Sequence, residues 1–330
     1  MSEKRFIYGQ MILRKITRCW RAAESVHQIT NENRVLLFCE VVINWLYFGA
    51  SDEDYLTMEF YRKNFREKKR WLTSKKNNRY LYKTVYSSEA IETFDNKVAF
   101  DKCFKHLMRH ETLAIQDNSE DCIRHFITRF GEVVVKPARG ACGVGVYKII
   151  DGDENAIKEL LKSKKSGKSL ICEQVIEQHP EMARMNPSSV NTIRVITMVD
   201  RKGEIQIINT CVKFGGSEKC ISNTMGGGFC CHVDAETGII DGLGHTIKGE
   251  RYFRHPVSKV IIPGFQIPCW KGVCDYAKQL AKVMPSGRYI GWDIVVLKDR
   301  YDVIEGNIHP GQDFQACDGV GRWKQIKSLI

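Results

Sequence analysis

The chain has 330 residues and a mass of 37.9 kDa, with 43% hydrophobic and 27% charged residues. This length exceeds what one compact core usually holds, so we expect one large domain or two to three interlocked domains. The composition is that of a globular protein and excludes a chain that is disordered throughout. The longest apolar stretch, residues 35–50, is interrupted by Glu40 and Asn44 and is shorter than the roughly 20 residues that cross a bilayer, so no transmembrane span is predicted.

The first ten residues, MSEKRFIYGQ, lack the uninterrupted apolar segment of a secretion signal, so we expect a cytoplasmic protein. The 13 cysteines are odd in number and no signal precedes them, which favours reduced thiols. Zinc binding is the alternative interpretation. It has little support, because no C-x-x-C pair occurs and the Cys230-Cys231-His232 run lacks zinc-finger spacing.

The formal net charge of +11 is concentrated in one segment, residues 62–83, which contain ten basic residues and a single acid, Glu67. The pattern therefore indicates a local basic patch, and no nucleic-acid partner is expected. Aromatic residues between the cations, such as Tyr61 and Phe65, would suit stacking on bases. Their helical spacing is explained equally well by an apolar stripe beneath a solvated basic face.

The first third of the chain is predicted to be helical. Apolar residues recur every three to four positions from Ile7 to Ala50 without a proline. A further helix is predicted from Tyr55, a loop around Asn78, and another helix over residues 96–110 with Asp95 as its N-cap.

After this region the pattern changes to β-rich runs interrupted by helices, which indicates an α+β arrangement. Strands are predicted at residues 133–135, 144–150, 170–172, 192–199, 205–212, 288–297 and 301–304, with helices at 154–163 and 270–283.

A glycine-rich loop lies between two of these strands. Residues 132–147 read EVVVKPARGACGVGVY, in which Lys136 ends one β-run and Gly140, Gly143 and Gly145 precede the next. The lysine precedes the glycines and no helix follows them, unlike a P-loop or a dinucleotide-binding fingerprint. The pattern predicts a flap whose backbone N–H groups close over phosphates while the lysine ammonium meets their charge. An ordinary hairpin with a glycine-rich turn remains the alternative.

Two β-runs near the C-terminus carry Asp293, Glu305 and Asn307. If the runs pair as a hairpin, Asp293 and Glu305 lie close together, and Glu305 and Asn307 share a strand face because they are two residues apart. Two carboxylates and an amide oxygen are suited to Mg²⁺ bound together with nucleotide phosphates. An acidic edge strand that discourages aggregation is the alternative.

A lysine ahead of a glycine flap, followed by Asp…Glu-x-Asn on late β-runs, resembles the ATP-grasp superfamily. The segment 95–97 resembles the helix start that carries the first nucleotide-binding lysine, here Lys97, with Lys102 as a competitor. The segment Glu173-Gln174-Val175-Ile176 resembles the hinge that holds the adenine, with Glu181 as the candidate for the ribose hydroxyls. The segment 191–195 resembles the strand whose arginine, here Arg194, meets the γ-phosphate or the acyl intermediate.

Within the superfamily, the chain is most similar to the sugar-transfer-associated ATP-grasp family. The similar segments are residues 54–56, 69–73, 178–180, 186–194 and 306–311. Each segment alone is short, but their number and order are fairly specific. One departure is that Ile-His-Pro follows Asn307, where related ligases often have proline directly.

The resemblance implies an ATP-grasp fold, in which two α+β subdomains clasp ATP, preceded by a helical N-terminal region. The expected division is a basic helical region over residues 1–94, a small subdomain with the glycine flap over 95–176, and a large subdomain with the metal-binding strands over 177–330. The implied cofactors are ATP and one or two Mg²⁺ ions.

The resemblance also implies carboxylate–amine ligation, in which a substrate carboxylate is phosphorylated and an amine attacks the acyl phosphate. Lys97 and Lys136 would neutralise the nucleotide phosphates, and Arg194 would hold the transferring phosphoryl group. A kinase acting on a hydroxyl and a nucleotide-binding protein without turnover remain the alternatives. The family suggests polysaccharide or sugar-conjugate biosynthesis, with an anionic glycan or a lipid-linked phosphate at residues 62–83.

Overall fold

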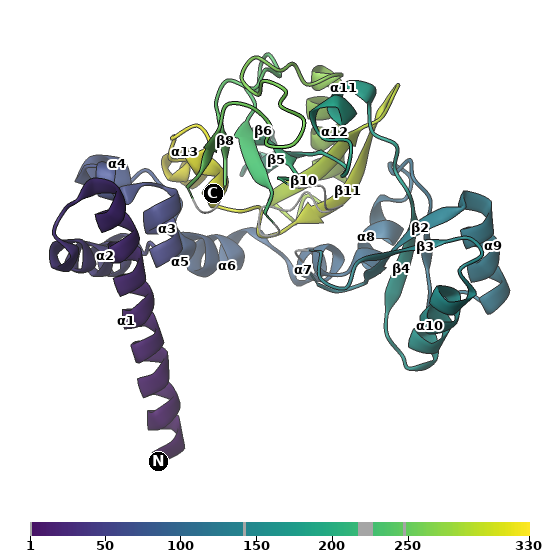
Figure 1. Ribbon diagram of the computed structural model, residues 1–330, viewed down its shortest axis with the longest axis horizontal. Coiled ribbons are helices and arrows are strands. Elements are labelled where there is room, and N and C mark those ends of the chain that lie inside the picture. Colours follow the sequence, from purple (N-terminus) through teal and green to yellow (C-terminus); the bar gives the residue numbers. More distant parts are fainter. Residues whose placement is uncertain (1, 141–142, 217–226, 247–248) are drawn as a thin grey trace.

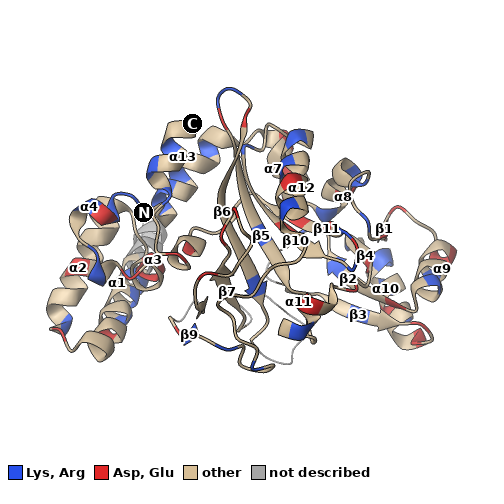
Figure 2. Cartoon of the chain, turned by 90° about the horizontal axis from the view of Figure 1, so that it is seen from above, with Lys and Arg blue, Asp and Glu red and all other residues tan. Residues whose placement is uncertain are grey.

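The computed structural model describes residues 2–140, 143–216, 227–246 and 249–330, with side chains described for residue 10 and from residue 12 onward. Three parts follow one another in Figure 1: a helical N-terminal region, a large central sheet, and a smaller sheet at the far side. Figure 2, from above, shows the same order, with the N-terminal helices and the small sheet flanking the large one.

The N-terminal region is a helical hairpin followed by short helices. Helix α1 (Ser2–Thr30) and helix α2 (Arg34–Phe48) are antiparallel neighbours, and Asn33 caps α2 by accepting two backbone N–H groups. The remaining elements are α3 (Asp52–Thr57), η1 (Phe60–Arg62), α4 (Phe65–Lys68), α5 (Ser74–Lys76), η2 (Asn77–Leu81), α6 (Tyr82–Val85) and α7 (Ser88–Asp95). Their core contains Val26, Leu37, Tyr55, Phe60 and Trp71.

The small sheet has four antiparallel strands in the order β1-β4-β2-β3. Its strands are β1 (Thr112–Ala114), β2 (Glu132–Pro137), β3 (Tyr147–Ile150) and β4 (Leu170–Gln174), and its helices are α9 (Glu120–Phe130) and α10 (Glu154–Lys165). Both helices place apolar side chains against the sheet, where Ile123, Ile127 and Leu160 are fully buried.

The large sheet has seven strands in the order β11-β10-β5-β6-β7-β8-β9, all paired antiparallel. The strands are β5 (Thr192–Val199), β6 (Ile205–Phe214), β7 (Phe229–His232), β8 (Gly244–His245), β9 (Arg251–Tyr252), β10 (Tyr289–Val296) and β11 (Tyr301–Asn307). The other elements around it are α8 (Lys97–Phe104), α11 (Pro180–Met185), α12 (Trp270–Val283), η4 (Asp313–Ala316) and α13 (Trp323–Leu329).

The two faces of the large sheet pack against different elements because β-strand side chains alternate. Helix α12 covers the face that carries Ile193, Val195 and Trp292. Helix α13 and residues 72–85 cover part of the other face, which carries Met198. Arg194 shares this second face, so the functional side chains described below lie opposite α12.

The predicted helices of the first third and the predicted strands are found, but the helix predicted over residues 96–110 ends at Phe104 and the strand predicted over 144–150 begins at Tyr147. Two local predictions are wrong. Asn96, and not Asp95, caps α8, because its side chain accepts the N–H of Val98 while its backbone is extended. The segment around Asn78 is not a loop but a continuous helical stretch, residues 74–85, that packs Leu81 and Val85 into the core.

The proposed division into parts at residues 95 and 177 stays a prediction. Helix α8 stands at the boundary: it follows residue 95, yet its Phe100 and Phe104 pack into the large-sheet core beside Trp292. Every cysteine among the described residues is a free thiol. None of the described helices is both long enough and apolar enough to span a membrane.

Candidate functional site

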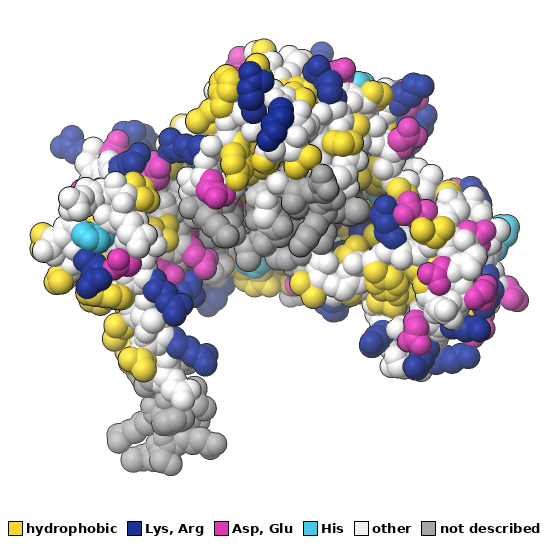
Figure 3. All heavy atoms as spheres, viewed as in Figure 1, with side chains coloured by type: hydrophobic (Ala, Val, Ile, Leu, Met, Phe, Trp, Pro, Cys, Tyr) yellow, Lys and Arg dark blue, Asp and Glu magenta, His cyan; other side chains and the backbone are white. Residues whose placement is uncertain are grey.

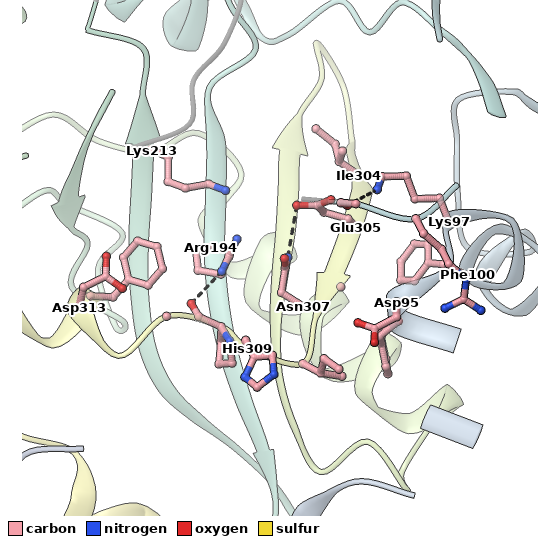
Figure 4. Close-up of a pocket in the computed structure, with 18 of the residues that line it drawn as sticks. Asp95, Lys97, Phe100, Arg194, Lys213, Ile304, Glu305, Asn307, His309 and Asp313 are labelled. Atoms are coloured by element: carbon pink, nitrogen blue, oxygen red, sulfur yellow. Dashed lines mark hydrogen bonds between the residues drawn. The ribbon is translucent and has the colours of Figure 1, made fainter. Parts of the chain in front are cut away.

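A cleft of about 800 Å³ lies between the large sheet, the start of α8 and the glycine loop. Figure 4 shows Arg194 and Lys213 on one side of it, Glu305 and Asn307 on strand β11, and Lys97 with Phe100 on α8 opposite. Its volume is in the range of clefts that hold a cofactor-sized ligand. Sequence reasoning placed Lys97, Gly140, Glu173, Arg194, Glu305 and Asn307 at a common site, and all six line this cleft.

Strand register explains why three of these positions meet. Asp293 of β10 lies opposite Glu305 of β11 on one side and opposite Arg194 of β5 on the other. Directly paired residues of antiparallel strands project from the same face. The expectation that Asp293 and Glu305 pair across a hairpin is confirmed.

Asp293 is held between two cations. Its Oδ1 and Oδ2 atoms accept hydrogen bonds from Arg194 Nε at 2.6 Å and Nη2 at 2.9 Å, and Lys213 Nζ lies 2.6 Å from Oδ2. Arg194 Nη1 also donates to the carbonyl of Pro310 at 2.7 Å. Arg194 and Asp293 are only 7% and 2% exposed, so this is a buried cluster with a net charge of +1 beside the cleft.

The electrostatics of the cluster follow from burial and pairing. Burial alone would raise the pKa of Asp293, but Arg194 and Lys213 outweigh it and hold the pKa well below the usual value. Burial opposes the charge on Arg194 as well, yet attraction to Asp293 raises its pKa. For Lys213, burial has the largest effect and its pKa is lowered despite Asp293.

Glu305 and Asn307 are the oxygen-bearing side chains that face the cleft on β11. Asn307 Nδ2 donates to Glu305 Oε1 at 3.4 Å and to the Gly291 carbonyl at 3.3 Å, and no described group donates to Asn307 Oδ1. A carboxylate and an amide oxygen fit a Mg²⁺ ion that keeps several ligands from water and phosphate. Asp293 differs, because both of its oxygens already accept from cations.

A second set of charged residues lies on α8 and on the neighbouring small sheet. Lys97 anchors the glycine loop, since its backbone N–H donates to Ala138 O at 2.8 Å and its Nζ donates to Gly140 O at 2.9 Å. Lys136 on β2 pairs with Glu173 on the neighbouring strand β4. The competitor Lys102 lies elsewhere, with its Nζ 3.2 Å from the exposed Asp117.

A buried histidine joins the two sheets, and sequence reasoning missed it. Asp302 of β11 accepts the backbone N–H of His110 and the ring Nδ1, each at 2.7 Å, together with the Arg109 N–H at 2.9 Å. His110 Nε2 lies 4.0 Å from Glu173 Oε2. His110 and Asp302 are 192 residues apart in the sequence, so no local sequence pattern could have predicted their contact.

Several predicted nucleotide residues do not line the described cleft: Lys136, Gly143, Gly145, Gln174, Val175, Ile176 and Glu181. Gln174 pairs with Glu111, accepting its N–H at 3.1 Å, and Val175 and Ile176 follow it in the segment between β4 and α11. Glu181 is exposed on α11 and pairs with Arg184 at 2.9 Å. The nucleotide-binding roles of these seven residues remain predictions.

The loop glycines adopt backbone angles that only glycine reaches without strain, between the antiparallel strands β2 and β3. Gly140, Gly143 and Gly145 have φ angles of 129°, 72° and 75°, in the region where only glycine is unstrained. A Cβ on Gly145 would lie 2.9 Å from the ring of Pro137. Residues 141 and 142 of this loop lie outside the described part of the chain.

The cleft also has a wall that the sequence did not indicate. Asp54 of α3 accepts the N–H groups of Ser51 and Ser74 at 2.9 and 2.8 Å, and Gln312 Nε2 donates to it at 3.3 Å. These contacts bring the N-terminal region against the segment after β11, and Asp54 with Asp313 closes this end of the cleft. Burial, with Asp54 nearby, raises the pKa of Asp313.

The two sheets with a nucleotide-sized cleft between them define the ATP-grasp class of fold. The profile of the family described as sugar-transfer associated ATP-grasp matches residues 76–329. The chain belongs to this family, and the fold class expected from the sequence is confirmed.

Solved structures show similarity at low sequence identity. An ATP-grasp ligase named PsnB, complexed with a phosphomimetic variant of a minimal precursor, Mg and ADP, is 16% identical with a TM-score of 0.45, over 74% of this chain and 60% of its own. D-alanyl-alanine synthetase A from Vibrio cholerae is 13% identical with a TM-score of 0.47, over 74% of this chain and 66% of its own. The chain therefore spans less than two thirds of these proteins. No curated protein matches it.

Proposed function

We propose that this protein is an ATP- and Mg²⁺-dependent carboxylate–amine ligase that acts through an acyl phosphate. The observation that carries the proposal is the meeting of Lys97, Glu305, Asn307 and the Arg194–Asp293–Lys213 cluster around one cleft of about 800 Å³. Phosphoryl transfer requires mainly positioning and charge neutralisation, and few covalent roles for protein groups. The cations and oxygen ligands around this cleft are of that kind.

Bound ATP with Mg²⁺ would supply the phosphoryl group that activates a carboxylate. Lys97, which lines the cleft, would contact phosphates, and Lys136, which is outside the described lining and pairs with Glu173, would join it on strand β2 ahead of the glycine loop. The loop itself would exclude water from a hydrolysable intermediate. Glu305 and Asn307 would hold the metal, with Asp293 entering its coordination only if it released Arg194 or Lys213.

Arg194 is proposed to position the reacting carboxylate or phosphoryl group. Its guanidinium is fixed by three hydrogen bonds, to both oxygens of Asp293 and to Pro310 O. A side chain held in this way loses little further conformational entropy when an anion arrives. The net positive charge of the cluster would attract such an anion.

The decisive experiment is an ADP-release screen of carboxylate and amine pairs in magnesium buffer, with products identified by mass spectrometry. Ligation requires both substrates before ADP appears, and an isotopically labelled carboxylate oxygen must be recovered in phosphate. A stable phosphoester formed without an amine would identify a kinase instead. Nucleotide binding without turnover of any pair would identify an inactive relative.

We further propose a role in polysaccharide or sugar-conjugate biosynthesis, with an anionic glycan or a lipid-linked phosphate bound at residues 62–83. Two of the ten cations are unsuited to this role. Lys68 is buried and pairs with Glu40 at 2.7 Å, and Lys76 donates to Trp71 O at 2.7 Å while burial lowers its pKa to about 8. The exposed cations in the segment would carry the interaction. Affinity for an anionic polysaccharide that did not weaken as salt was raised would contradict this proposal.

A further inference from the structure

Helix α2 carries a row of large apolar side chains that no described element covers. Leu36 is 71% exposed, Tyr47 62%, Leu46 61%, Ile43 58% and Val35 57%. At about 100° per residue these five positions fall within roughly 120° of the helix circumference. The opposite side of α2 packs into the N-terminal core through Leu37 and Val41. The helix is therefore apolar on both its buried and its exposed sides.

Helix α1 extends this surface. Ile12, Leu13, Ile16 and Trp20 lie on one side of α1 and are 36–66% exposed, and the ring of Trp20 contacts that of Phe38 on α2 with centroids 5.6 Å apart. Figure 3 shows hydrophobic side chains gathered along α1 and the neighbouring edge of the N-terminal region, with Lys and Arg beside them. We call the exposed side chains of these two helices the hairpin surface. An apolar surface of this kind marks an interaction site more often than isolated exposed residues do.

The rim of the hairpin surface is cationic. Lys15 Nζ lies 3.7 Å from the ring centre of Trp45, and the guanidinium of Arg34 lies 4.6 Å from that of Trp20. At the far end of α2, Tyr47 contacts Phe65 with ring centroids 5.1 Å apart, and Lys69 Nζ lies 4.5 Å from the Phe65 ring centre.

Most acids of this region are already engaged, the exception being the exposed Glu32 between α1 and α2, whose side chain pairs with no described cation. Glu24 pairs with Arg34 at 2.6 Å, Glu40 accepts from Lys68 and Tyr55 at 2.7 and 2.8 Å, and the Glu67 side chain accepts the backbone N–H of Asn64 at 2.7 Å. Lys15 and Lys69 have no acidic partner among the described side chains. The hairpin surface is thus apolar at its centre and positively charged at its margin.

We propose that the hairpin surface docks on an anionic lipid bilayer, with its aliphatic side chains in the acyl boundary and its cations among the headgroups. Tryptophan, tyrosine and lysine next to aliphatic residues are the composition of interfacial helices. A negative lipid surface complements the positive margin, whereas a second copy of the chain would bring like charges together. Peripheral docking of this type requires no membrane-spanning helix. The proposal does not depend on the chemistry of the cleft.

Sedimentation of the full-length protein with vesicles tests the proposal. We expect binding to vesicles of phosphatidylcholine with phosphatidylglycerol, weaker binding to phosphatidylcholine alone, and release from the anionic vesicles as salt is raised. Leu36→Glu with Ile43→Glu should lower the partition coefficient about tenfold or more, since two buried apolar contacts are replaced by repelled charges. Lys15→Gln with Lys69→Gln should weaken binding to the anionic vesicles alone.

The matched control is Ile150→Glu with Ile261→Glu, which places the same charges at positions 61% and 43% exposed elsewhere on the surface. This variant should bind vesicles as the wild type does, and circular dichroism should show that all variants keep their helical content. Equal vesicle binding by the Leu36/Ile43 variant, or no binding by the wild type, would overturn the proposal. A dimer in sedimentation equilibrium that the Leu36/Ile43 variant abolishes would show that a second copy covers the surface instead.

Discussion

Arg194 and Asp293 form a two-point ion pair across the central strands β5 and β10, with distances of 2.6 and 2.9 Å, and both side chains are buried. Lys213 joins the same carboxylate from β6. Because one carboxylate pairs with two nearby cations, it stabilises the sheet locally and leaves the cluster with a net charge of +1 beside the cleft. Removal of the Asp293 carboxylate would leave the cations of Arg194 and Lys213 buried together without a counter-charge.

The Asp293→Asn variant is therefore expected to lower the free energy of unfolding by about 3–5 kcal/mol, as for other broken buried pairs. Urea denaturation followed by circular dichroism measures the loss. The matched control is Asp299→Asn, the same substitution in the turn after β10, where the carboxylate is exposed. It should change stability by less than about 1 kcal/mol. Similar stability of the two variants would contradict the structural role of Asp293.

The ion pair between Arg194 and Asp293 also predicts that the free energy of unfolding depends on pH. The pKa of Asp293 is lower in the folded protein than in the unfolded chain, where it is about 3.9. The folded state therefore binds fewer protons, so the contribution of Asp293 is fully present above about pH 5 and is lost as the pH falls toward and below the unfolded value. Unfolding free energy measured from pH 6 downward should fall more steeply for the wild type than for Asp293→Asn. Parallel curves would count against the prediction.

Lys136 is expected to contribute to nucleotide affinity under the proposed function. Lys136→Met should weaken ADP binding in magnesium buffer by about tenfold to 100-fold, the effect of losing one charge-assisted contact. Isothermal titration calorimetry measures it. Lys148→Met is the control, because Lys148 lies on the adjacent strand β3 and pairs with Glu132 at 3.1 Å on the surface. If Lys136→Met bound ADP with the affinity of the wild type, Lys136 would not be part of the nucleotide site.

Gly291 is expected to be intolerant of a side chain. An added Cβ would lie 2.6 Å from Pro310 Cβ and 2.8 Å from Arg194 Cδ, so alanine must displace the arginine or the loop after β11. We expect Gly291→Ala to cost about 1–3 kcal/mol of stability, as in other overpacked sites. Gly242→Ala is the control, since its Cβ would meet only Cys317 O at 3.5 Å. Thermal unfolding of both variants tests the difference.

Glu305 is expected to bind the metal ion and to contribute little to the stability of the fold. Glu305→Gln should keep the unfolding free energy within about 1 kcal/mol of the wild type, because the residue is only partly buried and forms no salt bridge with any described side chain. It should weaken Mn²⁺ binding in the presence of ADP, measured by electron paramagnetic resonance. The exposed Glu204→Gln, on the turn before β6, should bind Mn²⁺ normally. Unchanged Mn²⁺ affinity in Glu305→Gln would exclude it as a ligand.

The local sequence determined most of the elements and several of the cleft residues. Period-two runs predict strands and period-3.6 runs predict helices because side chains on one face must be buried together. The spacing of Glu305 and Asn307 placed them on one face, and the order of Lys136 and the glycines predicted the strand–loop–strand arrangement of β2 and β3. These are relationships over fewer than about ten residues, where the backbone geometry leaves few alternatives.

Only the tertiary structure decided which partners these residues take. The register of β6 against β5 brings Lys213 to Asp293 from 80 residues away, so a carboxylate expected to be a metal ligand is paired with two cations. Asp54 reaches the cleft from the N-terminal region, whereas His110 binds Asp302 outside the cleft lining. Glu181 also lies outside the described lining and pairs with Arg184. Charge pairing between distant strands depends on how sheets and helices pack, and local periodicity does not carry that information.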